Sequence, residues 1–226
     1  MKLRIPFYSN TSDNTHCFQA SLKMILKYFL PGHIFSWEKL EKMSAKKEGL
    51  WTWPTATILV LKKMGFDLVV MEDFDYERFG NEGEYYLLEK YGRQAGRAQI
   101  EHSDILQEIK LAKQLIKALK PINRVPSFDD IRYLMQQGYL IGCNINSRIL
   151  NNKAGYVGHF LVITGIGNNK IIVHDPGLPP HQNRVIPKNI FEKAWGYPSH
   201  HNKNLIGFKL SKKAKKRFAL ISSGKD

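Results

Sequence analysis

Two apolar runs late in the chain, joined by a short polar turn, constrain the fold most strongly. Residues 159–166 (HFLVITGI) and 170–175 (KIIVHD) are rich in β-branched side chains, which is typical of buried strands. Gly167, Asn168 and Asn169 lie between them and favour a tight hairpin. The two runs are therefore predicted to pair as antiparallel strands, so that the start of one lies beside the end of the other.

Hydrophobic periodicity predicts that most helices precede the sheet along the chain. Apolar positions recur at helical spacing before Gly138, whereas a strand pattern dominates after it. Helices are predicted over residues 17–29, 37–43, 54–64, 103–119, 128–137 and 189–195, with one more within 76–91. Further strands are predicted over residues 66–71, 139–145 and 205–210, and a proline-rich loop over 175–187. This order favours an α+β protein with an N-terminal helical half packed on a C-terminal antiparallel sheet.

Several of these helices carry recognisable end signals. Ser36, Ser103 and Ser127 are predicted N-caps, because a serine hydroxyl can accept a hydrogen bond from a free N–H of the first turn. Asp130 follows Ser127 at the spacing of a capping box. Gly65 is predicted to end the helix over residues 54–64. These signals indicate where each helix begins or ends.

Cys17 lies in the first turn of the first predicted helix. The apolar stripe of this helix is formed by Leu22, Ile25, Leu26 and Phe29. Asn14 and Thr15 are good N-caps just before it. A thiol in a first turn interacts with the positive end of the helix dipole, which lowers its pKa and increases the reactive thiolate fraction. An inert, buried thiol at a helix start is the alternative interpretation.

The hairpin supplies the partners that a nucleophilic cysteine needs. His159 begins the first strand and Asp175 ends the second, so antiparallel pairing places both at one end of the sheet. Asp175 would hold the imidazole in one tautomer, and His159 would take the proton of Cys17. Alone, His159 could be a core histidine and Asp175 a turn residue before Pro176. The three together favour nucleophilic catalysis.

At these residues the sequence resembles the C39-like peptidases, a branch of the papain-like cysteine peptidases. The first block of the family is similar to IPFYSN and CFQASLKMILKYF, with Cys17 at the catalytic cysteine. The middle and histidine blocks are similar to DDIRYLMQQGYLIGCNIN and to GHFLVITGIGNNKIIVHDPG, which carries His159 and Asp175. The resemblance implies a papain-like fold and a cysteine peptidase that cleaves an amide (peptide) bond through a Cys-His-Asp triad.

The resemblance also suggests how the chain is organised. It covers residues 5–35 and 127–210, so residues 1–226 are expected to form a single domain. Residues 72–120 would be a divergent or inserted helical segment. Residues 211–226 would be a basic and flexible tail.

The family usually has a glutamine upstream of the cysteine that donates to the oxyanion of the reaction. The best-placed residue here is Asn10, whose amide N–H can take the same role, and Asn14 or Gln19 could serve instead. The backbone N–H of Cys17 would be the second donor. Phe18 stands where the family usually has glycine.

Three other functions remain open at this point. The same triad, with an amine in place of water, would give an acyltransferase or transglutaminase. A papain-like module without catalytic activity could bind a peptide or an acidic partner, and Phe18 and Asn10 favour this alternative. A nucleic-acid binder could act through the basic tail. Five aromatic residues are predicted either to line a peptide groove or to pack in the core: Trp51, Trp53, Tyr85, Tyr86 and Tyr156.

The formal net charge of +14 bears on possible partners. Thirty-four basic residues outnumber 20 acidic ones, and part of the excess lies in residues 209–218 (KLSKKAKKRF). This segment could contact anionic partners weakly, or it could be a solvated tail. The sequence has no signature of a dedicated nucleic-acid module.

The two cysteines and the apolar segments exclude several classes of protein. Cys17 and Cys143 do not form a disulfide scaffold, and Cys143 lies in an apolar run where an inert buried thiol is expected. The sequence has no recognisable metal-ligand spacing, so neither a metal nor a cofactor is expected. No apolar run is long enough to span a membrane, and the N-terminal apolar stretch is too short for a secretory signal. A cytoplasmic location is the simplest expectation.

Overall fold

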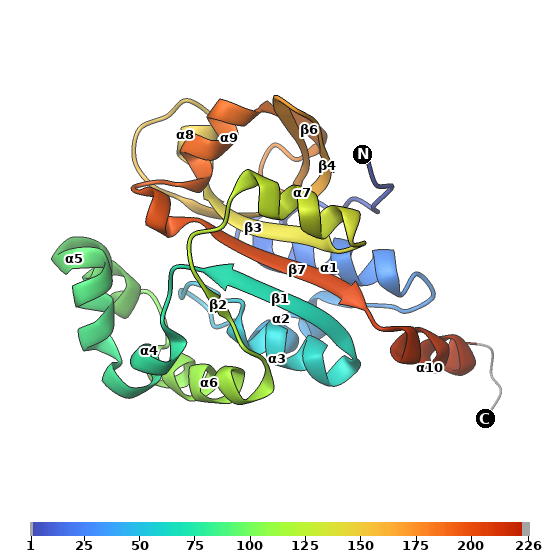
Figure 1. The fold of residues 1–226 in the computed structure, drawn as a ribbon, viewed down its shortest axis with the longest axis horizontal. Coiled ribbons are helices and arrows are strands. Elements are labelled where there is room, and N and C mark those ends of the chain that lie inside the picture. The colour runs from blue at the N-terminus through green and yellow to red at the C-terminus, as the bar shows by residue number, and fades with distance from the viewer. Residues whose placement is uncertain (1, 223–226) are drawn as a thin grey trace.

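A computed structural model describes residues 2–222, with side chains described as far as residue 220. One seven-stranded sheet runs through the molecule in the order β2-β1-β7-β3-β4-β5-β6 (Figure 1). The strands are β1 (Phe66–Glu72), β2 (Ile122–Asn123), β3 (Leu140–Asn146), β4 (Gly158–Ile166), β5 (Lys170–Asp175), β6 (His181–Pro187) and β7 (Asn204–Leu210). The helices are α1 (Cys17–Phe29), α2 (Trp37–Ser44), α3 (Thr55–Met64), α4 (Tyr76–Glu82), α5 (Glu84–Glu101), α6 (Ile105–Ala118), α7 (Phe128–Gln136), α8 (Ser147–Leu150), α9 (Lys188–Trp195) and α10 (Lys212–Ser222). The predicted α+β class is confirmed.

The last strand in the chain lies in the interior of the sheet. Strand β7 pairs with β1 on one side and with β3 on the other, both antiparallel. The short strand β2 pairs with β1 in parallel. The helical N-terminal half is therefore joined to the C-terminal sheet through backbone hydrogen bonds as well as through packing.

Alternation along each strand divides the core into two clusters on opposite faces of the sheet. Phe160 and Val162 of β4 pack in the cluster that contains the apolar residues of α1 and α3. Leu161 and Ile163 pack in the other cluster, with residues of α7 and α9. In Figure 1, α7 lies in front of the sheet and α1 lies behind it. Because both faces are covered, the strands read as nearly continuous apolar runs.

The helix ends confirm some predicted caps and correct others. The Ser36 hydroxyl accepts from the N–H of Lys39, and Ser127 with Asp130 forms a capping box. The N-cap of α6 is Asp104, not Ser103, because the Ser103 hydroxyl accepts from the indole N–H of Trp53 at 2.9 Å.

The helix that carries Cys17 also begins differently from the prediction. Its N-cap is His16, which makes no side-chain capping hydrogen bond, so the predicted caps at Asn14 and Thr15 are wrong. Instead, the side chain of Asn14 accepts from Asn10, and the hydroxyl of Thr15 donates to Asp13. Cys17 is the first residue of α1, and its predicted place in the first turn is confirmed.

Three segments differ from their predicted form. Residues 181–187, predicted as part of a loop, form strand β6 on the edge of the sheet. The helix predicted within residues 76–91 is two helices, α4 and α5, and Gly92 breaks α5 with a φ of 75°. Residues 212–222 of the predicted tail are helical, with Ala214 buried, while residues 223–226 lie outside the described part of the chain.

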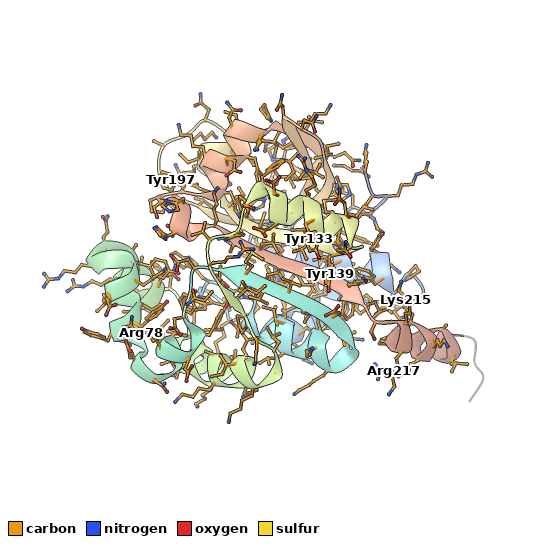
Figure 2. All side chains as sticks on the ribbon, viewed as in Figure 1. Arg78, Tyr133, Tyr139, Tyr197, Lys215 and Arg217 are labelled. Atoms are coloured by element: carbon orange, nitrogen blue, oxygen red, sulfur yellow. The ribbon has the colours of Figure 1, made fainter. Side chains whose placement is uncertain are left out.

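The strongly basic helix α10 lies at one end of the molecule. Lys215 and Arg217 project there, far from Tyr197 at the opposite side (Figure 2). No helix among the described residues is both long and apolar enough to cross a membrane.

Candidate active site

The β4–β5 hairpin brings two of the predicted site residues into contact. The strands pair antiparallel, with Val162 opposite His174. The Nε2 atom of His159 lies 2.6 Å from Oδ1 of Asp175. Both side chains are buried, at 7% and 4% exposed. This contact depends on a β-bulge between Ile163 and Gly165, which shifts the pairing by one residue and brings His159 and Asp175 to the same face of the sheet.

Two further groups hold the carboxylate of Asp175 in place. Arg184 Nη1 lies 2.8 Å from Oδ2, and the backbone N–H of Gly177 donates to Oδ1 at 3.0 Å. Burial raises the pKa of Asp175, but the hydrogen bond and charge of His159, with these two contacts, outweigh it and lower the pKa to about 2. Asp175 is therefore ionised at neutral pH.

Arg184 is a site residue that the sequence did not reveal. Arg184 of β6 lies opposite Val173 of β5. Because Val173 is two positions before Asp175 on the same strand, the side chains of Arg184 and Asp175 lie on the same face of the sheet. Residues 175–187 were predicted as a loop, so the side-chain alternation of a strand was not applied to them. Recognising residues 181–187 as an edge strand would have placed Arg184 on the face of Asp175.

Helix α1 places Cys17 beside β4. The Ser21 hydroxyl donates to the carbonyl of Phe160 at 3.1 Å and ties the first turn of α1 to the strand. Burial raises the pKa of the Cys17 thiol, but the hydrogen bond and charge of His159 lower it, with help from the backbone N–H groups of Phe160 and Phe18. The net pKa of Cys17 lies below its ordinary value.

The same contacts act on His159 in the opposite direction. Burial lowers the pKa of the imidazole, but the hydrogen bonds to Asp175 and Cys17 have a larger, opposite effect and bring the pKa to about 9. Because Asp175 occupies Nε2, the ring nitrogen that faces Cys17 is Nδ1. At neutral pH this arrangement favours a thiolate on Cys17 and an imidazolium on His159.

The loop before α1 is held together by the side chain of Asn10. Its Oδ1 accepts from the backbone N–H groups of Thr11 at 2.9 Å and His16 at 2.7 Å, which identifies this atom as oxygen. Its Nδ2 therefore donates to Oδ1 of Asn14 at 2.8 Å. Asn14 has a φ of 59° and lines the cavity described below, so its own Nδ2 is the amide nitrogen left for another partner. One of the two amide protons of Asn10 is therefore used in a hydrogen bond within the loop.

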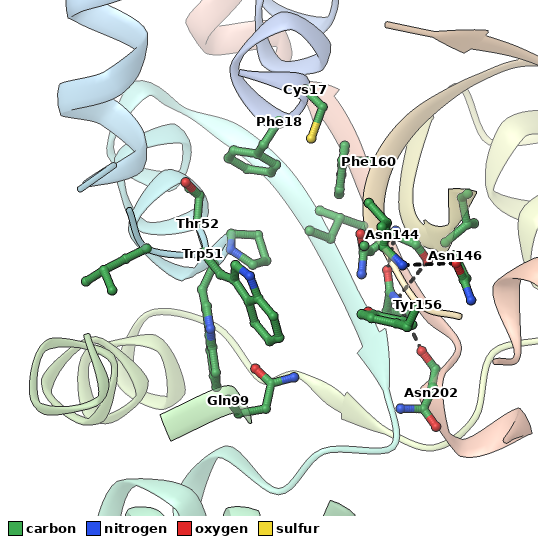
Figure 3. A pocket seen from close by; sticks show the side chains of 18 of the residues that line it. Cys17, Phe18, Trp51, Thr52, Gln99, Asn144, Asn146, Tyr156, Phe160 and Asn202 are labelled. Atoms are coloured by element: carbon green, nitrogen blue, oxygen red, sulfur yellow. Dashed lines mark hydrogen bonds between the residues drawn. The ribbon is translucent and has the colours of Figure 1, made fainter. Parts of the chain in front are cut away.

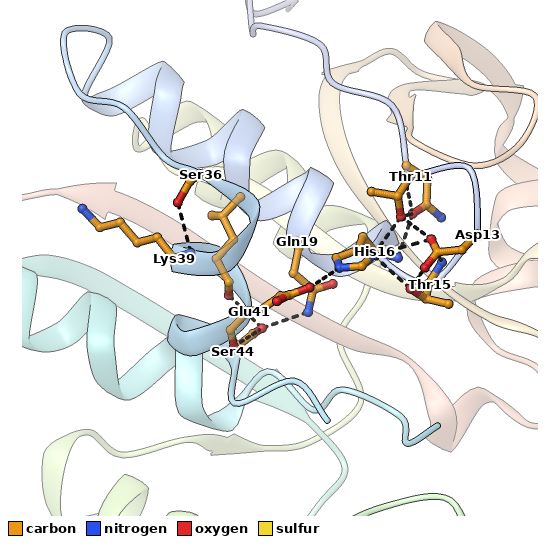
Figure 4. A network of polar contacts seen from close by, with 11 residues as sticks. Thr11, Asp13, Thr15, His16, Gln19, Ser36, Lys39, Glu41 and Ser44 are labelled. Atoms are coloured by element: carbon orange, nitrogen blue, oxygen red, sulfur yellow. Dashed lines mark hydrogen bonds and ion pairs between the residues drawn. The ribbon is translucent and has the colours of Figure 1, made fainter. Parts of the chain in front are cut away.

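The side chain of His16, next to Cys17, contacts Glu41, Thr11 and Thr15 rather than His159 or Asp175 (Figure 4). Its Nε2 lies 2.5 Å from Oε1 of Glu41, and its Nδ1 contacts the hydroxyls of Thr11 and Thr15. Asp13 binds the same two hydroxyls, and these bonds lower the pKa of its carboxyl. This network fixes the entry of the chain into α1.

The side chains of Gln19 and Phe18 are both buried. The Nε2 of Gln19 donates to the hydroxyl of Ser44 at 2.8 Å, and its side chain is fully buried. Phe18 packs edge-on against Phe160, with ring centroids 4.9 Å apart. The larger residue at the usual glycine position is thus accommodated in the core rather than over the sulfur.

A cavity of about 940 Å³ opens beside Cys17 (Figure 3). We call it the Cys17 cavity; Asn14, Gln19 and Asn144 are among the residues that line it. Three of the five aromatic residues predicted for a groove line it, namely Trp51, Trp53 and Tyr156. Tyr85 is 67% exposed elsewhere, and the buried Tyr86 accepts from the N–H of Asp75 through its hydroxyl.

The remaining cysteine has none of these contacts. Cys143 is free and fully buried in β3, and burial raises the pKa of its thiol. Within residues 2–222, no group of three or more His, Cys, Asp or Glu side chains is placed to hold a metal ion.

An antiparallel sheet that carries a buried histidine–aspartate pair, with a cysteine-bearing helix packed beside it, is the architecture of the papain-like class. The sequence model of the Peptidase C39 like family matches residues 2–202, and the chain belongs to this family. The membership suggests a function of the peptidase type. No curated protein matches the chain.

Proposed function

We propose that the protein is a thiol hydrolase that cleaves amide bonds of a peptide or protein. Cys17 is the nucleophile, His159 the general acid and base, and Asp175 the residue that orients the imidazole. The observation that carries this proposal is the 2.6 Å contact between His159 Nε2 and Asp175 Oδ1, which leaves Nδ1 for Cys17. The lowered pKa of Cys17 and the raised pKa of His159 support the same roles.

The reaction follows from these protonation states. The thiolate of Cys17 attacks the carbonyl carbon, and the C=O electrons move to oxygen to give a tetrahedral oxyanion. When the C–N bond breaks, His159 gives its Nδ1 proton to the leaving amine. Water then attacks the thioester while His159 takes a proton from it, and the carboxylic acid leaves Cys17. Asp175 stays ionised and keeps the ring oriented throughout.

The oxyanion needs hydrogen-bond donors near the sulfur. The backbone N–H of Cys17 is one, because the first N–H groups of a helix lack intrahelical partners. Asn10 remains a predicted second donor, but its contacts support a positioning role. We assign the direct role to Asn14, whose Oδ1 is held by Asn10 so that its Nδ2 is free for the cavity.

The same apparatus supports acyl transfer when an amine replaces water. In that case the thioester is resolved by the amine and a new amide forms, with His159 again acting as base. The open Cys17 cavity would admit either acceptor. The two outcomes differ in the product: hydrolysis gives a free carboxylate, whereas transfer gives a product heavier by the amine.

A peptide library tests the proposal. The library is incubated with the native protein, with Cys17→Ala and with Cys143→Ser as a matched control, and new termini are identified by mass spectrometry. The native protein and the control should produce the same new termini, and Cys17→Ala should produce none. Cleavage that persists in Cys17→Ala would show that another group is responsible.

A further inference from the structure

The charge of the Cys17 cavity is opposite to that of the whole protein. The chain has 34 Lys and Arg residues and 20 Asp and Glu residues. The described lining nevertheless contains five carboxylates and two lysines. The carboxylates belong to Asp13, Glu41, Glu48, Glu72 and Asp73, and the lysines are Lys46 and Lys203. The basic helix α10 lies at the far end of the molecule from the lining residue Tyr197 (Figure 2). The cavity is therefore an acidic site in a basic protein.

Most of these charges already have partners within the protein. Lys203 forms an ion pair with Glu192 and lies 5.0 Å above the ring of Trp195. Glu41 binds His16, and Asp73 binds Lys90 at 2.8 Å. These groups are held in place by the fold itself.

Glu72 is different. It is the last residue of β1, and alternation with Val70 places its side chain on the face of the sheet covered by α1. Its Oε1 accepts from the hydroxyl of Tyr76 at 2.6 Å. Among the described side chains, no cation forms an ion pair with it; Lys90 pairs with Asp73 at 2.8 Å, and its charge acts on Glu72 only from a longer distance. Burial raises the pKa of the Glu72 carboxyl, against the hydrogen bond of Tyr76 and the charge of Lys90, so a positively charged ligand beside it would stabilise the ionised form.

Aromatic residues from separate elements line the same cavity as this carboxylate. Tyr91 of α5 and Tyr156, which precedes β4, are two of them. Trp53 also lines the cavity and is fixed by stacking on Phe79, with ring centroids 5.5 Å apart. Electron-rich rings beside a carboxylate bind ammonium and guanidinium groups through their faces.

A buried acceptor on another wall independently points to a ligand. Gln19 is fully buried and lines the cavity, and its Oε1 has no hydrogen-bond partner among the described residues. The Ser44 hydroxyl donates to the carbonyl of Leu40 at 2.9 Å, so it accepts from Gln19 Nε2, and this fixes Oε1 as the free end. The missing partner is an N–H or O–H donor, and the backbone N–H of a bound peptide is one such group.

We propose that the Cys17 cavity recognises a lysine or arginine side chain of the peptide. Glu72 pairs with the cationic group, Tyr91 and Tyr156 contact it through their rings, and a peptide N–H donates to Oε1 of Gln19. Because Cys17 lines the same cavity, the basic residue belongs to the peptide that Cys17 would attack. The identity of the ligand as a substrate rests on the proposed function, whereas its binding does not require the chemistry of Cys17.

Binding in the absence of cleavage tests this proposal. The protein carries Cys17→Ala, and the probes are acetyl-Ala-Ala-Lys-Ala-Ala-amide and the same peptide with norleucine in place of lysine. The two probes differ in charge but hardly in shape. Calorimetry should show that the lysine peptide binds roughly tenfold more tightly, as expected for one desolvated charge contact.

Glu72→Gln, added to Cys17→Ala, should abolish the difference between the two peptides. Tyr76 can still donate to the amide oxygen, so thermal unfolding should show that this variant remains folded. Glu84→Gln removes an exposed carboxylate at the start of α5 and serves as the matched control, which should keep the preference.

Three results would overturn the proposal: equal affinity for both peptides, no binding of either, or a preference that survives Glu72→Gln. A lysine preference in a protein whose Cys17 proves unreactive would instead retain this binding site and reject the hydrolase. The two proposals can therefore fail separately.

Discussion

Nε2 of His159 lies 2.6 Å from Oδ1 of Asp175, and both side chains are buried at one end of the β4–β5 hairpin. The contact fixes the imidazole so that its Nδ1 faces Cys17. With the contact of Cys17 it raises the pKa of His159 to about 9, and with those of Gly177 and Arg184 it lowers the pKa of Asp175 to about 2. The reactivity of the site therefore depends on where each group titrates.

The pH dependence of peptide cleavage should reflect these shifts. A histidine with a raised pKa keeps its proton up to about 9, so cleavage should decline above that pH as the general acid is lost. Alkylation of Cys17 needs the thiolate but no general acid, so its rate should not decline there. Both rates, measured from pH 5 to pH 10, check this difference. A parallel decline of the two rates would contradict it.

Arg184 should stabilise the protein through Asp175. Removing it leaves a buried carboxylate with one partner fewer, and Arg184→Met should cost about 2 kcal/mol of unfolding free energy at pH 7. Because the pKa of Asp175 is lowered from 3.8 to about 2, the stabilisation by its contacts is present above 3.8 and is lost as the pH falls through 2. Urea unfolding at pH 7 measures the loss.

Arg124→Met is the matched control for that measurement. Arg124 pairs with Asp130 at 2.6 Å but is half exposed, so its loss should cost less than about 1 kcal/mol. Equal losses for the two variants would mean that Arg184 acts as an ordinary surface residue.

Asn14 and Asn10 should affect the two reactions of Cys17 differently. If Asn14 donates to the oxyanion, Asn14→Ala should lower kcat roughly 100-fold or more, as for other single donors. The rate of alkylation should not change, because that reaction forms no oxyanion. Asn10→Ala removes the contacts that order the loop and should lower both rates. A normal kcat in Asn14→Ala would exclude the direct role.

Glu108 should make the stability of the protein depend on pH. It is buried in α6 near Thr55, and burial raises its pKa from 4.5 to about 7. The stabilisation by its protonated form is complete below 4.5 and is lost as the pH rises through 7. At 1.36 kcal/mol per unit, the loss is on the order of 3 kcal/mol.

Glu108→Gln should therefore be more stable than the native protein at pH 8 and equally stable at pH 4.5. Unfolding free energies at the two pH values check this. Glu101→Gln, at the exposed end of α5, is the control and should change neither value. A loss of stability in Glu108→Gln at pH 8 would show that its charged form is needed.

The sequence allowed His159 and Asp175 to be placed at one end of the sheet, because a short turn between two apolar runs makes them antiparallel neighbours. It did not reveal the β-bulge between Ile163 and Gly165 that brings both side chains to the same face. The place of Cys17 in a first turn followed in the same way from the apolar stripe of α1. These signals lie within segments of a few residues.

The features that were missed depend on contacts between distant segments. Asn14 and Thr15 are suitable caps, but the side chain of Asn10 draws the loop into another path, and His16 becomes the N-cap. Arg184 lies on an edge strand that is flanked by prolines, and these prolines favoured the prediction of a loop. Glu72 reads as the polar end of β1, and nothing local shows that the residues around it form a cavity.

The most direct test of the account compares the alkylation of the two cysteines by iodoacetamide at pH 7, followed by peptide mass spectrometry. Cys17 should be labelled far faster than the buried Cys143, and His159→Ala should slow the labelling of Cys17 roughly tenfold or more. His181→Ala, at the exposed start of β6, should leave the rate unchanged. Equal and slow labelling of both cysteines in the native protein would contradict the assignment of Cys17 as the nucleophile.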